Sequence, residues 1–300
     1  MWDQMLKEIL KGDFKTIARA ISLIENEVPG FEELMVSLPH FNTPIIGITG
    51  PPGAGKSTLV DALIGAMVSK EKNVAVLCID PSSPFNMGAI LGDRIRMSNW
   101  YNNPAVFIRS LATRGSLGGL HPHIIEISEI LKVAPFDYII VETVGVGQSE
   151  IEIVGLADVT TVVLVPEAGD EIQTMKAGLM EIADIFVVNK CDRPDADQFV
   201  HNLRSMLAPT FSRHSEMVPI IKTIASKQEG ILELMSAIEA VLRHHESTDK
   251  KSWLIAERAY YLIERNRMKD VNKQRLKEAI EELQDKNAFN LYRFIQQFRH

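Results

Sequence analysis

Residues 45–58 have the sequence IIGITGPPGAGKST, in which a short apolar run leads into a glycine-rich turn and then a helical pattern. The turn has the spacing G-x-x-x-x-G-K-S, which is typical of a phosphate-binding P-loop between a strand and a helix. Gly50, Gly53 and Gly55 lack a Cβ atom, so the backbone can close around a polyphosphate and turn its N–H groups inward. The positive end of the following helix would face the same anion. This stretch therefore predicts a nucleoside triphosphate site.

The residues of this loop have distinct expected roles. Lys56 would neutralise the β- and γ-phosphates, and the Ser57 hydroxyl would be a ligand of Mg²⁺. The alternative is a glycine-rich turn that holds a lysine by chance, and the strand-to-helix context argues against it. The nucleotide-binding residues expected here are Gly50, Pro51, Pro52, Gly53, Ala54, Gly55, Lys56, Ser57 and Thr58.

Short apolar runs alternate with helical patterns after this loop. Most runs are β-branched and not strictly alternating, as in strands that are buried on both faces. We therefore expect an α/β fold with a doubly wound, mostly parallel sheet that binds ligands at the carboxyl ends of its strands. The expected strands are Ile45–Thr49, Val74–Ile79, Val106–Ile108, Tyr138–Val141, Thr161–Val165, Ile185–Val188 and Pro219–Ile221, and the expected helices are Thr58–Lys70, His123–Lys132, Ile172–Ile182, Asp195–Leu207 and Ile231–His244.

Helical segments flank this region on both sides. We expect residues 1–42 to form an N-terminal helical extension, residues 43–246 the P-loop domain, and residues 247–300 a C-terminal helical arm. A charged linker at 245–251 precedes the arm, and Ser252 is expected to cap its first helix. Exposed aromatic residues on the arm favour self-association, and an arm folded back on its own domain is an equal alternative.

Composition narrows the possible function classes. The chain has 300 residues, 46% hydrophobic and 24% charged, which describes a globular protein with a sizeable core. Its formal net charge of −7 gives no electrostatic reason to expect nucleic acid or an anionic membrane as a partner. Cys78 and Cys191 match no zinc or disulfide pattern, and no apolar run is long enough to span a bilayer. We expect a cytoplasmic protein without a signal peptide.

The run Ile185–Val188 is followed at once by the motif N-K-x-D at residues 189–192. The Asp192 carboxylate can accept hydrogen bonds from N1–H and the exocyclic amine of guanine, and adenine offers neither group at those positions. A site built on this contact rejects the wrong base, because its carboxylate would be left unpaired. Lys190 would lie over the base and Asn189 would brace the loop. The residues expected around the base are Asn189, Lys190, Asp192 and, more weakly, Ser226 and Lys227 after the last strand.

Glu142 ends the strand that begins at Tyr138. A carboxylate there can hold Mg²⁺ directly or through water, and the N–H group of Gly145 could contact the γ-phosphate. Most guanine-nucleotide switches have Asp at the position of Glu142. No glutamine directly follows Gly145, so the usual water-positioning residue is missing. We therefore predict slow intrinsic hydrolysis that a partner or a second copy of the chain accelerates.

Asp80 and Asp93 form a second group of acids after the strand Val74–Ile79. Two further acids near a triphosphate suit Mg²⁺ ligation or orientation of the attacking water. For Asp93 the alternative is a surface acid that pairs with Arg94 or Arg96. The sequence leaves these two interpretations open.

Together these residues resemble the MeaB/MMAA (ArgK-type) family of P-loop GTPases, in the broad class of signal-recognition-particle and metal-insertion GTPases. The resemblance spans residues 10–250, and its most specific element is the run ETVGVGQSE at 142–150. Residues 86–89 and Glu167 depart from the usual family pattern, which leaves the nucleotide chemistry intact and the identity of the partner open. The other motifs are GPPGAGKST at 50–58, DPSS at 80–83, ILGDR at 90–94, AGDE at 168–171 and NKCD at 189–192.

The resemblance implies a homodimeric GTPase chaperone of an adenosylcobalamin-dependent acyl-CoA mutase, typically methylmalonyl-CoA mutase. Such proteins gate cofactor loading and protect the mutase from inactivation. The implied ligand is GTP or GDP with Mg²⁺, and no tightly held cobalamin is expected on this chain. The C-terminal helices resemble the dimerisation arm of the family.

Motif positions in the family imply further roles. Residues 80–93 would form a first switch, residues 142–150 a second, and residues 168–176 a third in which Lys176 faces the nucleotide or the mutase. The implied Mg²⁺ residues are Ser57, Asp80 and Glu142; the implied catalytic residues are Lys56, Glu142 and Asp93, the candidate for water activation; and the implied switch residues are Asp93, Gln148, Asp170, Glu171 and Lys176.

Three other functions stay open. A metal-insertion GTPase for nickel enzymes would need Cys or His ligands near its switches, but His121, His123, His244 and His245 are expected at the surface. A kinase or transport ATPase of the ArgK type would conflict with the guanine-reading motif. A nucleotide-gated scaffold would bind GTP without depending on its turnover.

Overall fold

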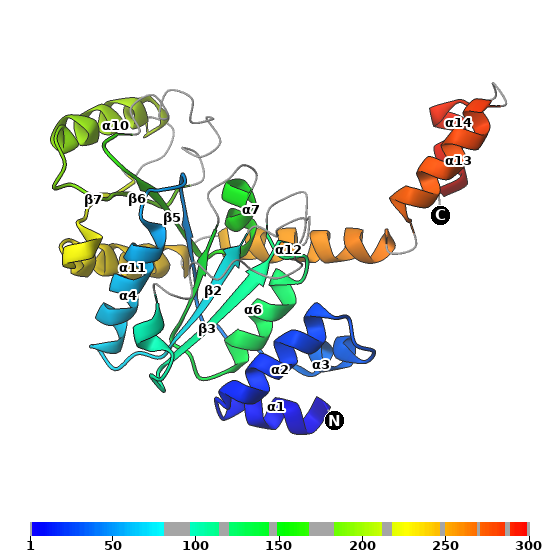
Figure 1. The fold of residues 1–300 in the computed structure, drawn as a ribbon, viewed down its shortest axis with the longest axis horizontal. Helices are drawn as coiled ribbons and strands as arrows, with labels where there is room; N and C mark the ends of the chain where they lie inside the picture. The colour runs from blue at the N-terminus through cyan, green and yellow to red at the C-terminus, as the bar shows by residue number, and fades with distance from the viewer. Residues whose placement is uncertain are drawn as a thin grey trace. The chain divides into compact units, whose positions relative to one another are not determined.

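The computed structural model describes residues 2–80, 97–113, 120–143, 149–167, 183–211, 218–246, 250–268, 271–285 and 289–298. The chain divides into two compact units, Met1–Leu254 and Ile255–His300 (Figure 1). The expected division at residues 42 and 247 stays a prediction.

The first unit is built on a sheet that, in the described part of the chain, has seven parallel strands in the order β3-β2-β4-β1-β5-β6-β7. Every residue of β1, β2, β5 and β6 is buried, which agrees with the short β-branched runs of the sequence. The expected parallel sheet is confirmed. Its strands are β1 (Ile45–Thr49), β2 (Val74–Asp80), β3 (Val106–Ala112), β4 (Tyr138–Glu142), β5 (Val159–Leu164), β6 (Ile185–Val188) and β7 (Ile220–Lys222).

Helices cover both faces of this sheet, so the expected double winding is also confirmed. Helices α4 (Lys56–Val68) and α11 (Ile231–Glu246) bury their apolar side chains with one face of the sheet. Helices α6 (Ile124–Val133), α7 (Ser149–Leu156) and α10 (Ala196–Phe211) pack against the other face. Strand β1 lies inside the sheet between β4 and β5, so the loop after β1 lies beside the ends of both neighbours.

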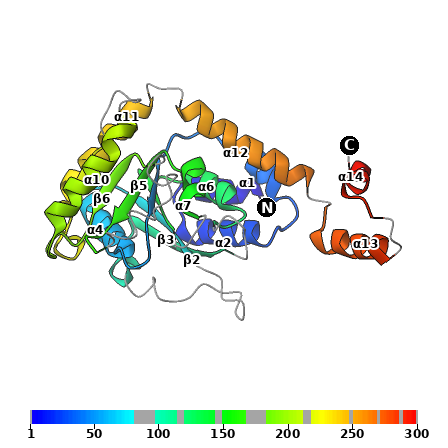
Figure 2. The same ribbon diagram turned by 90° about the horizontal axis from the view of Figure 1, so that it is seen from above.

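The N-terminal helices α1 (Trp2–Leu10), α2 (Phe14–Glu25) and α3 (Phe31–Ser37) belong to the core of the first unit. Helices α1 and α2 lie beside α6 in both views (Figure 1, Figure 2). Ile9, Ile17 and Leu34 are completely buried there, and the ring of Phe14 lies 5.5 Å from that of Phe107 on β3. The extension therefore packs against β3 and α6 as part of the core of the first unit and is not a free arm.

The second unit contains most of α12 (Lys250–Arg267), together with α13 (Lys273–Asp285), α14 (Leu291–Ile295) and the short helix η3 (Gln296–Phe298). Its core includes Phe294, whose ring centroid lies 5.6 Å from that of Phe298. Tyr260 and Tyr292 are 67% and 76% exposed, so the aromatic surface expected for this region is present. Self-association through it stays a prediction. None of the described helices has the length and apolar character needed to cross a membrane.

Several element boundaries differ from the sequence expectation. Helix α4 begins at Lys56 and not at Thr58, because Gly55 takes the left-handed conformation that precedes the first turn. Helix α12 begins at Lys250, so Ser252 lies inside the helix and does not cap it. Strand β3 continues past Ile108 to Ala112. The expected helix Ile172–Ile182 lies outside the described residues.

Candidate nucleotide-binding site

The carboxyl edge of the sheet collects the predicted motifs. The P-loop follows β1, Asp80 and Glu142 are the last residues of β2 and β4, and residues 189–192 follow β6. A further short helix, η2 (Ala225–Lys227), follows β7. Because all these strands are parallel, the motifs meet at one edge of the sheet although they are far apart in sequence.

The P-loop requires glycine at two positions, because another segment of the same chain approaches its backbone closely there. Gly50 and Gly55 have φ angles of +136° and +89°, which side chains other than glycine rarely adopt. A Cβ atom at Gly50 would lie 2.1 Å from the carbonyl oxygen of Val163, and one at Gly55 would lie 2.5 Å from Nδ2 of Asn189. The loop is therefore packed tightly against β5 and the loop after β6.

Lys56 and Ser57 form the start of α4 beneath this loop. The ammonium group of Lys56 donates hydrogen bonds to the carbonyl oxygens of Gly50 and Pro51 over 2.9 Å and 3.0 Å. These bonds hold the positive charge against the loop, and the side chain is buried. The first backbone N–H groups of a helix have no partner inside it, so this end of α4 is suited to an anion.

Ser57 and Glu142 are in direct contact. The Ser57 hydroxyl donates to Oε1 of Glu142 over 2.7 Å, and both side chains are buried. Asp80 is also buried and ends β2, the strand that pairs with β4 on the side away from β1. Hydroxyl and carboxylate oxygens are the ligands that Mg²⁺ prefers, so the residues present here fit this ion.

Asn189 joins three loops at the site. Its amide nitrogen donates to the carbonyl oxygen of Ala54 in the P-loop over 3.0 Å. Its amide oxygen accepts hydrogen bonds from the Thr223 hydroxyl and the Ala225 backbone N–H, both over 3.1 Å. The expected bracing by Asn189 is thus present, and it reaches the loop after β7 as well. Lys190 adds a second link to the P-loop, because its ammonium group donates to the carbonyl oxygen of Gly53 over 2.7 Å.

Asp192 is partly open to solvent beside Lys227. The ammonium nitrogen of Lys227 lies 3.6 Å from Oδ2 of Asp192, and the Asp192 side chain is 43% exposed. Cys191 directly precedes Asp192 in the motif, and its Sγ donates a hydrogen bond to the carbonyl oxygen of Val188 over 3.0 Å. Burial raises the pKa of the Cys191 thiol. The structure thus brings the predicted base-reading residues together, and their contacts with guanine stay predictions.

Six of the predicted site residues lie outside the described part of the chain, so their roles stay predictions: Asp93, Gly145, Gln148, Asp170, Glu171 and Lys176.

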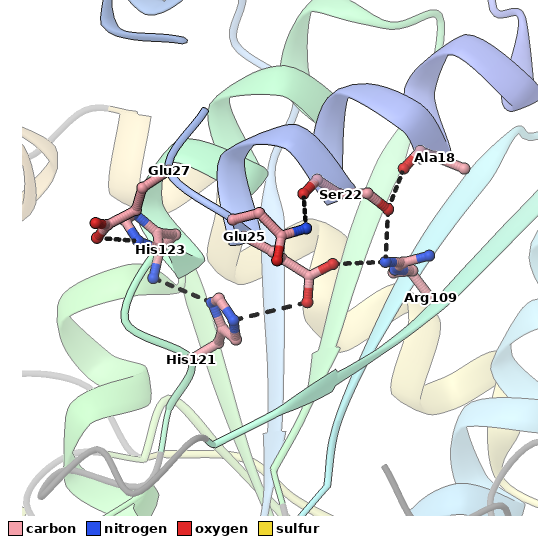
Figure 3. A network of polar contacts seen from close by, with 8 residues as sticks. Ala18, Ser22, Glu25, Glu27, Arg109, His121 and His123 are labelled. Carbon is pink, nitrogen blue, oxygen red and sulfur yellow. Dashed lines mark hydrogen bonds and ion pairs between the residues drawn. The ribbon is translucent and has the colours of Figure 1, made fainter. Parts of the chain in front are cut away.

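The prediction that His121 and His123 lie at the surface is wrong. Both are buried, and Figure 3 shows them between α2 and the start of α6. The His123 backbone N–H donates to Nδ1 of His121 over 3.1 Å, and its ring nitrogens lie 3.1 Å from a Glu27 oxygen and 3.3 Å from a Glu126 oxygen. The burial depends on the N-terminal helices, which no local pattern connects with these histidines. Among the described residues, no group of three or more His, Cys, Asp or Glu could hold a metal ion.

A buried pair of hydroxyls at the same edge of the sheet was not predicted. Thr143 follows Glu142, and its Oγ1 donates to Oγ1 of Thr49 at the end of β1 over 2.9 Å. The only signal in the sequence is that both threonines adjoin site motifs, which does not reveal that they touch.

The fold and site define a P-loop protein with a guanine-type base loop. The family model "Methylmalonyl Co-A mutase-associated GTPase MeaB" matches residues 17–281. A predicted GTPase of Pyrococcus abyssi is 42% identical over 285 residues, which cover 93% of this chain and 83% of the relative. GTPase ArgK of Escherichia coli is 36% identical over 245 residues, covering 78% and 74% of the two chains. This chain belongs to the MeaB family of GTPases.

Two other proteins are similar to this chain, one in sequence and one in fold. The fused isobutyryl-CoA mutase of Geobacillus kaustophilus is 36% identical over 237 residues, which are 74% of this chain and 22% of that one. A crystal structure named "LAO/AO transport system kinase" has a TM-score of 0.66 at 23% identity and covers 99% of this chain and 96% of that one. The second similarity supports the fold alone.

Proposed function

We propose that this chain binds and hydrolyses GTP with Mg²⁺ and uses the nucleotide to gate cofactor loading and protection of an adenosylcobalamin-dependent acyl-CoA mutase. The proposed binding of GTP is best supported by the contact of Asn189 with Ala54, because this hydrogen bond joins the guanine motif directly to the phosphate loop. The mutase part is supported by the family description and by the relative in which a similar segment is fused to a mutase.

Different residues at the site would contact the phosphates, the base and the Mg²⁺ ion. Lys56 and the N-terminal end of α4 would neutralise the phosphates, while Asp192 selects guanine and Lys190 covers the base. Ser57, Asp80 and Glu142 would hold Mg²⁺ at the ends of neighbouring strands. The ion, when bound, would supply positive charge to the phosphate oxygens during transfer. Asp93 is proposed to orient the attacking water.

The same proposal includes the partner, the rate of hydrolysis, the oligomeric state and the functional segments of the chain. The partner would be a mutase of the methylmalonyl-CoA type, and hydrolysis by this chain alone would be slow. The chain would act as a homodimer that uses its exposed C-terminal aromatic residues, among them Tyr260 and Tyr292. Its three functional parts would be residues 1–42, 43–246 and 247–300, and the switches would lie at 80–93, 142–150 and 168–176.

Base selection is tested by the substitution Asp192→Asn. We expect the wild-type protein to bind GTP at least 100-fold more tightly than ATP, on the order of the discrimination that a lost buried hydrogen-bond partner produces. An amide at this position would pair with the 2-carbonyl of xanthine, so the variant should prefer xanthosine triphosphate. Fluorescent-nucleotide titration measures both preferences. Comparable affinity of the wild-type protein for ATP, or guanine preference retained by the variant, would contradict the assignment and favour an ATPase.

The partner is tested by purifying the protein from its native cells and identifying what accompanies it. We expect a cobalamin-dependent mutase subunit, and we expect the purified mutase to accelerate GTP hydrolysis severalfold. An unchanged rate with every mutase tested would leave a nucleotide-gated scaffold. Tight stoichiometric binding of Ni²⁺ or Zn²⁺ by the full chain would instead support a metal-insertion role.

A further inference from the structure

The two buried threonines at the carboxyl edge join the strand before the P-loop to the strand that carries Glu142. Thr49 is the last residue of β1 and precedes Gly50, and Thr143 directly follows Glu142. Their hydroxyl oxygens lie 2.9 Å apart, and the side chains are 0% and 1% exposed. The backbone N–H of Thr143 also donates to the carbonyl oxygen of Ile48 over 3.0 Å.

These two hydrogen bonds keep β1 and β4 aligned beyond the last residue pair of the sheet register between them. The paired register of the two strands ends at Ile48 and Glu142, so Thr143 is the first residue after it. Thr49 is paired with Val162 on β5, and a valine would match the shape of either threonine. Burial of a hydroxyl costs free energy of folding unless the hydroxyl is hydrogen-bonded. We therefore expect the threonine pair to align β1 with β4 and not only to fill space.

Glu142 is the residue that this alignment affects most. On one side its carboxylate accepts the Ser57 hydroxyl over 2.7 Å, and on the other its backbone continues into Thr143. A hydroxyl–hydroxyl bond is directional, and a displacement of about 0.5 Å would carry the Thr49–Thr143 distance outside the usual range. The pair therefore holds the backbone next to Glu142 to within a fraction of an ångström of the P-loop.

We propose that Thr49 and Thr143 are positioning residues for GTP hydrolysis: their paired hydroxyls hold Glu142 in register with the P-loop without touching the nucleotide. The inference rests on the proposed hydrolysis of GTP. It predicts that loss of the pair slows turnover and raises the Mg²⁺ concentration needed for it, whereas the preference for guanine over adenine, which depends on the loop after β6, is unchanged.

The test uses four single variants of the full chain and one double variant. Thr143→Val removes the donor, Thr143→Ser keeps it, and Thr49→Val removes the acceptor. Thr161→Val is the matched control, because Thr161 on the adjacent strand β5 is completely buried and its hydroxyl has no hydrogen-bond partner in the described residues. Each variant is measured for kcat, KM, Mg²⁺ dependence, GDP affinity and thermal unfolding.

We expect Thr143→Val and Thr49→Val to lower kcat about 10-fold, since small displacements from a catalytic geometry can cost up to about 100-fold. KM and GDP affinity should stay within about 2-fold, Thr143→Ser should recover most of the rate, and Thr161→Val should match the wild type. The double variant Thr49→Val/Thr143→Val should be no slower than either single variant, because the two hydroxyls act as one unit.

Three results would overturn the inference: wild-type turnover in Thr143→Val, equal loss in Thr143→Ser and Thr143→Val, or additive losses in the double variant. Titration of each variant with GDP gives the concentration of folded, nucleotide-binding protein, and the hydrolysis rate divided by this concentration separates loss of fold from loss of rate. A wild-type chain that binds GTP but never hydrolyses it, with or without a mutase, would overturn the proposed function and this inference together. Normal wild-type hydrolysis with an unaffected Thr143→Val variant would overturn the inference alone.

Discussion

Asn189 is buried among three loops and uses both ends of its amide. Its nitrogen holds the P-loop at Ala54, and its oxygen accepts from Thr223 and Ala225 after β7. A carboxylate in its place would lose the donor to Ala54 and bring a negative charge against that carbonyl oxygen. The side chain thus fixes the separation between the loop after β6, the P-loop and the loop after β7.

The close approach of Asn189 to Gly55 leads to a prediction about stability. Gly55→Ala places a methyl group 2.5 Å from the Asn189 nitrogen at a φ of +89°, so both strain and a lost hydrogen bond are expected. Gly53→Ala is the matched control, because its φ is +77° but its Cβ would meet no atom within 4 Å. Left-handed strain alone costs about 1–2 kcal/mol per residue.

We therefore expect Gly53→Ala to lower the free energy of unfolding by about 1–2 kcal/mol. Gly55→Ala should lower it by roughly a further 1–3 kcal/mol, the cost of leaving a buried polar group without its partner. Urea unfolding without nucleotide measures the difference. Equal losses in the two variants would mean that Asn189 moves aside at no cost.

The N-terminal helices are joined to the sheet by polar contacts as well as by apolar packing. Figure 3 shows the chain of contacts from α2 to β3 and to the segment before α6. Arg109 on β3 donates to Glu25 over 2.5 Å and to the Ser22 hydroxyl over 3.1 Å, and His121 lies 3.7 Å from Glu25. These contacts give Arg109 polar partners within β3, which continues beyond the apolar run Val106–Ile108.

Removing one member of this ion pair should destabilise the first unit. Because the Glu25 side chain is only 9% exposed, Glu25→Ala leaves Arg109 without its carboxylate partner in a largely buried site, and we expect a loss of roughly 2–4 kcal/mol. The double variant Glu25→Leu/Arg109→Met should lose less than Glu25→Ala, because no charge is left unpaired. Chemical denaturation of the full chain measures both.

The surface pair Lys11–Glu8, whose side chains are 69% and 33% exposed, provides the control. Lys11→Ala should change stability by less than about 1 kcal/mol, as is usual for exposed ion pairs. If Glu25→Ala were as mild as Lys11→Ala, the polar contacts of α2 would be incidental and apolar packing alone would hold the N-terminal layer.

At the scale of the whole molecule, the chain separates recognition of the nucleotide from its C-terminal helices. All described contacts of the candidate site come from residues between β1 and η2, within the unit Met1–Leu254. The unit Ile255–His300 has its own small aromatic core and keeps many of its apolar side chains exposed.

This separation predicts the behaviour of a chain that ends at Leu254, the last residue of the first unit. Its guanine-nucleotide affinity should stay within about 2-fold of the full chain, because no site contact is removed, while its mass in light scattering should change from that of a dimer to that of a monomer. A truncated dimer would show that another surface makes the assembly. Loss of nucleotide binding would show that the C-terminal helices support the site.

The strands, the parallel sheet and the two loops expected to bind phosphate and guanine could all be predicted from the sequence. Each of these depends on residues next to one another in the chain, so β-branched runs, glycines and the N-K-x-D spacing are enough to predict them. The start of α4 was missed by two residues, because it depends on the left-handed conformation of Gly55.

Which of these residues are in contact could not be predicted from the sequence, because the contacts depend on how the chain folds in three dimensions. The contacts Ser57–Glu142, Asn189–Ala54 and Thr143–Thr49 connect residues 85, 135 and 94 positions apart. The contacts Ser57–Glu142 and Thr143–Thr49 depend on a strand order that places β4 beside β1, and Asn189–Ala54 depends on β6 lying next to β5, the other neighbour of β1. A local pattern carries no information about that order. The burial of His121 has the same cause, since it is covered by helices that precede it by about 100 residues and that no periodicity of its own segment reveals.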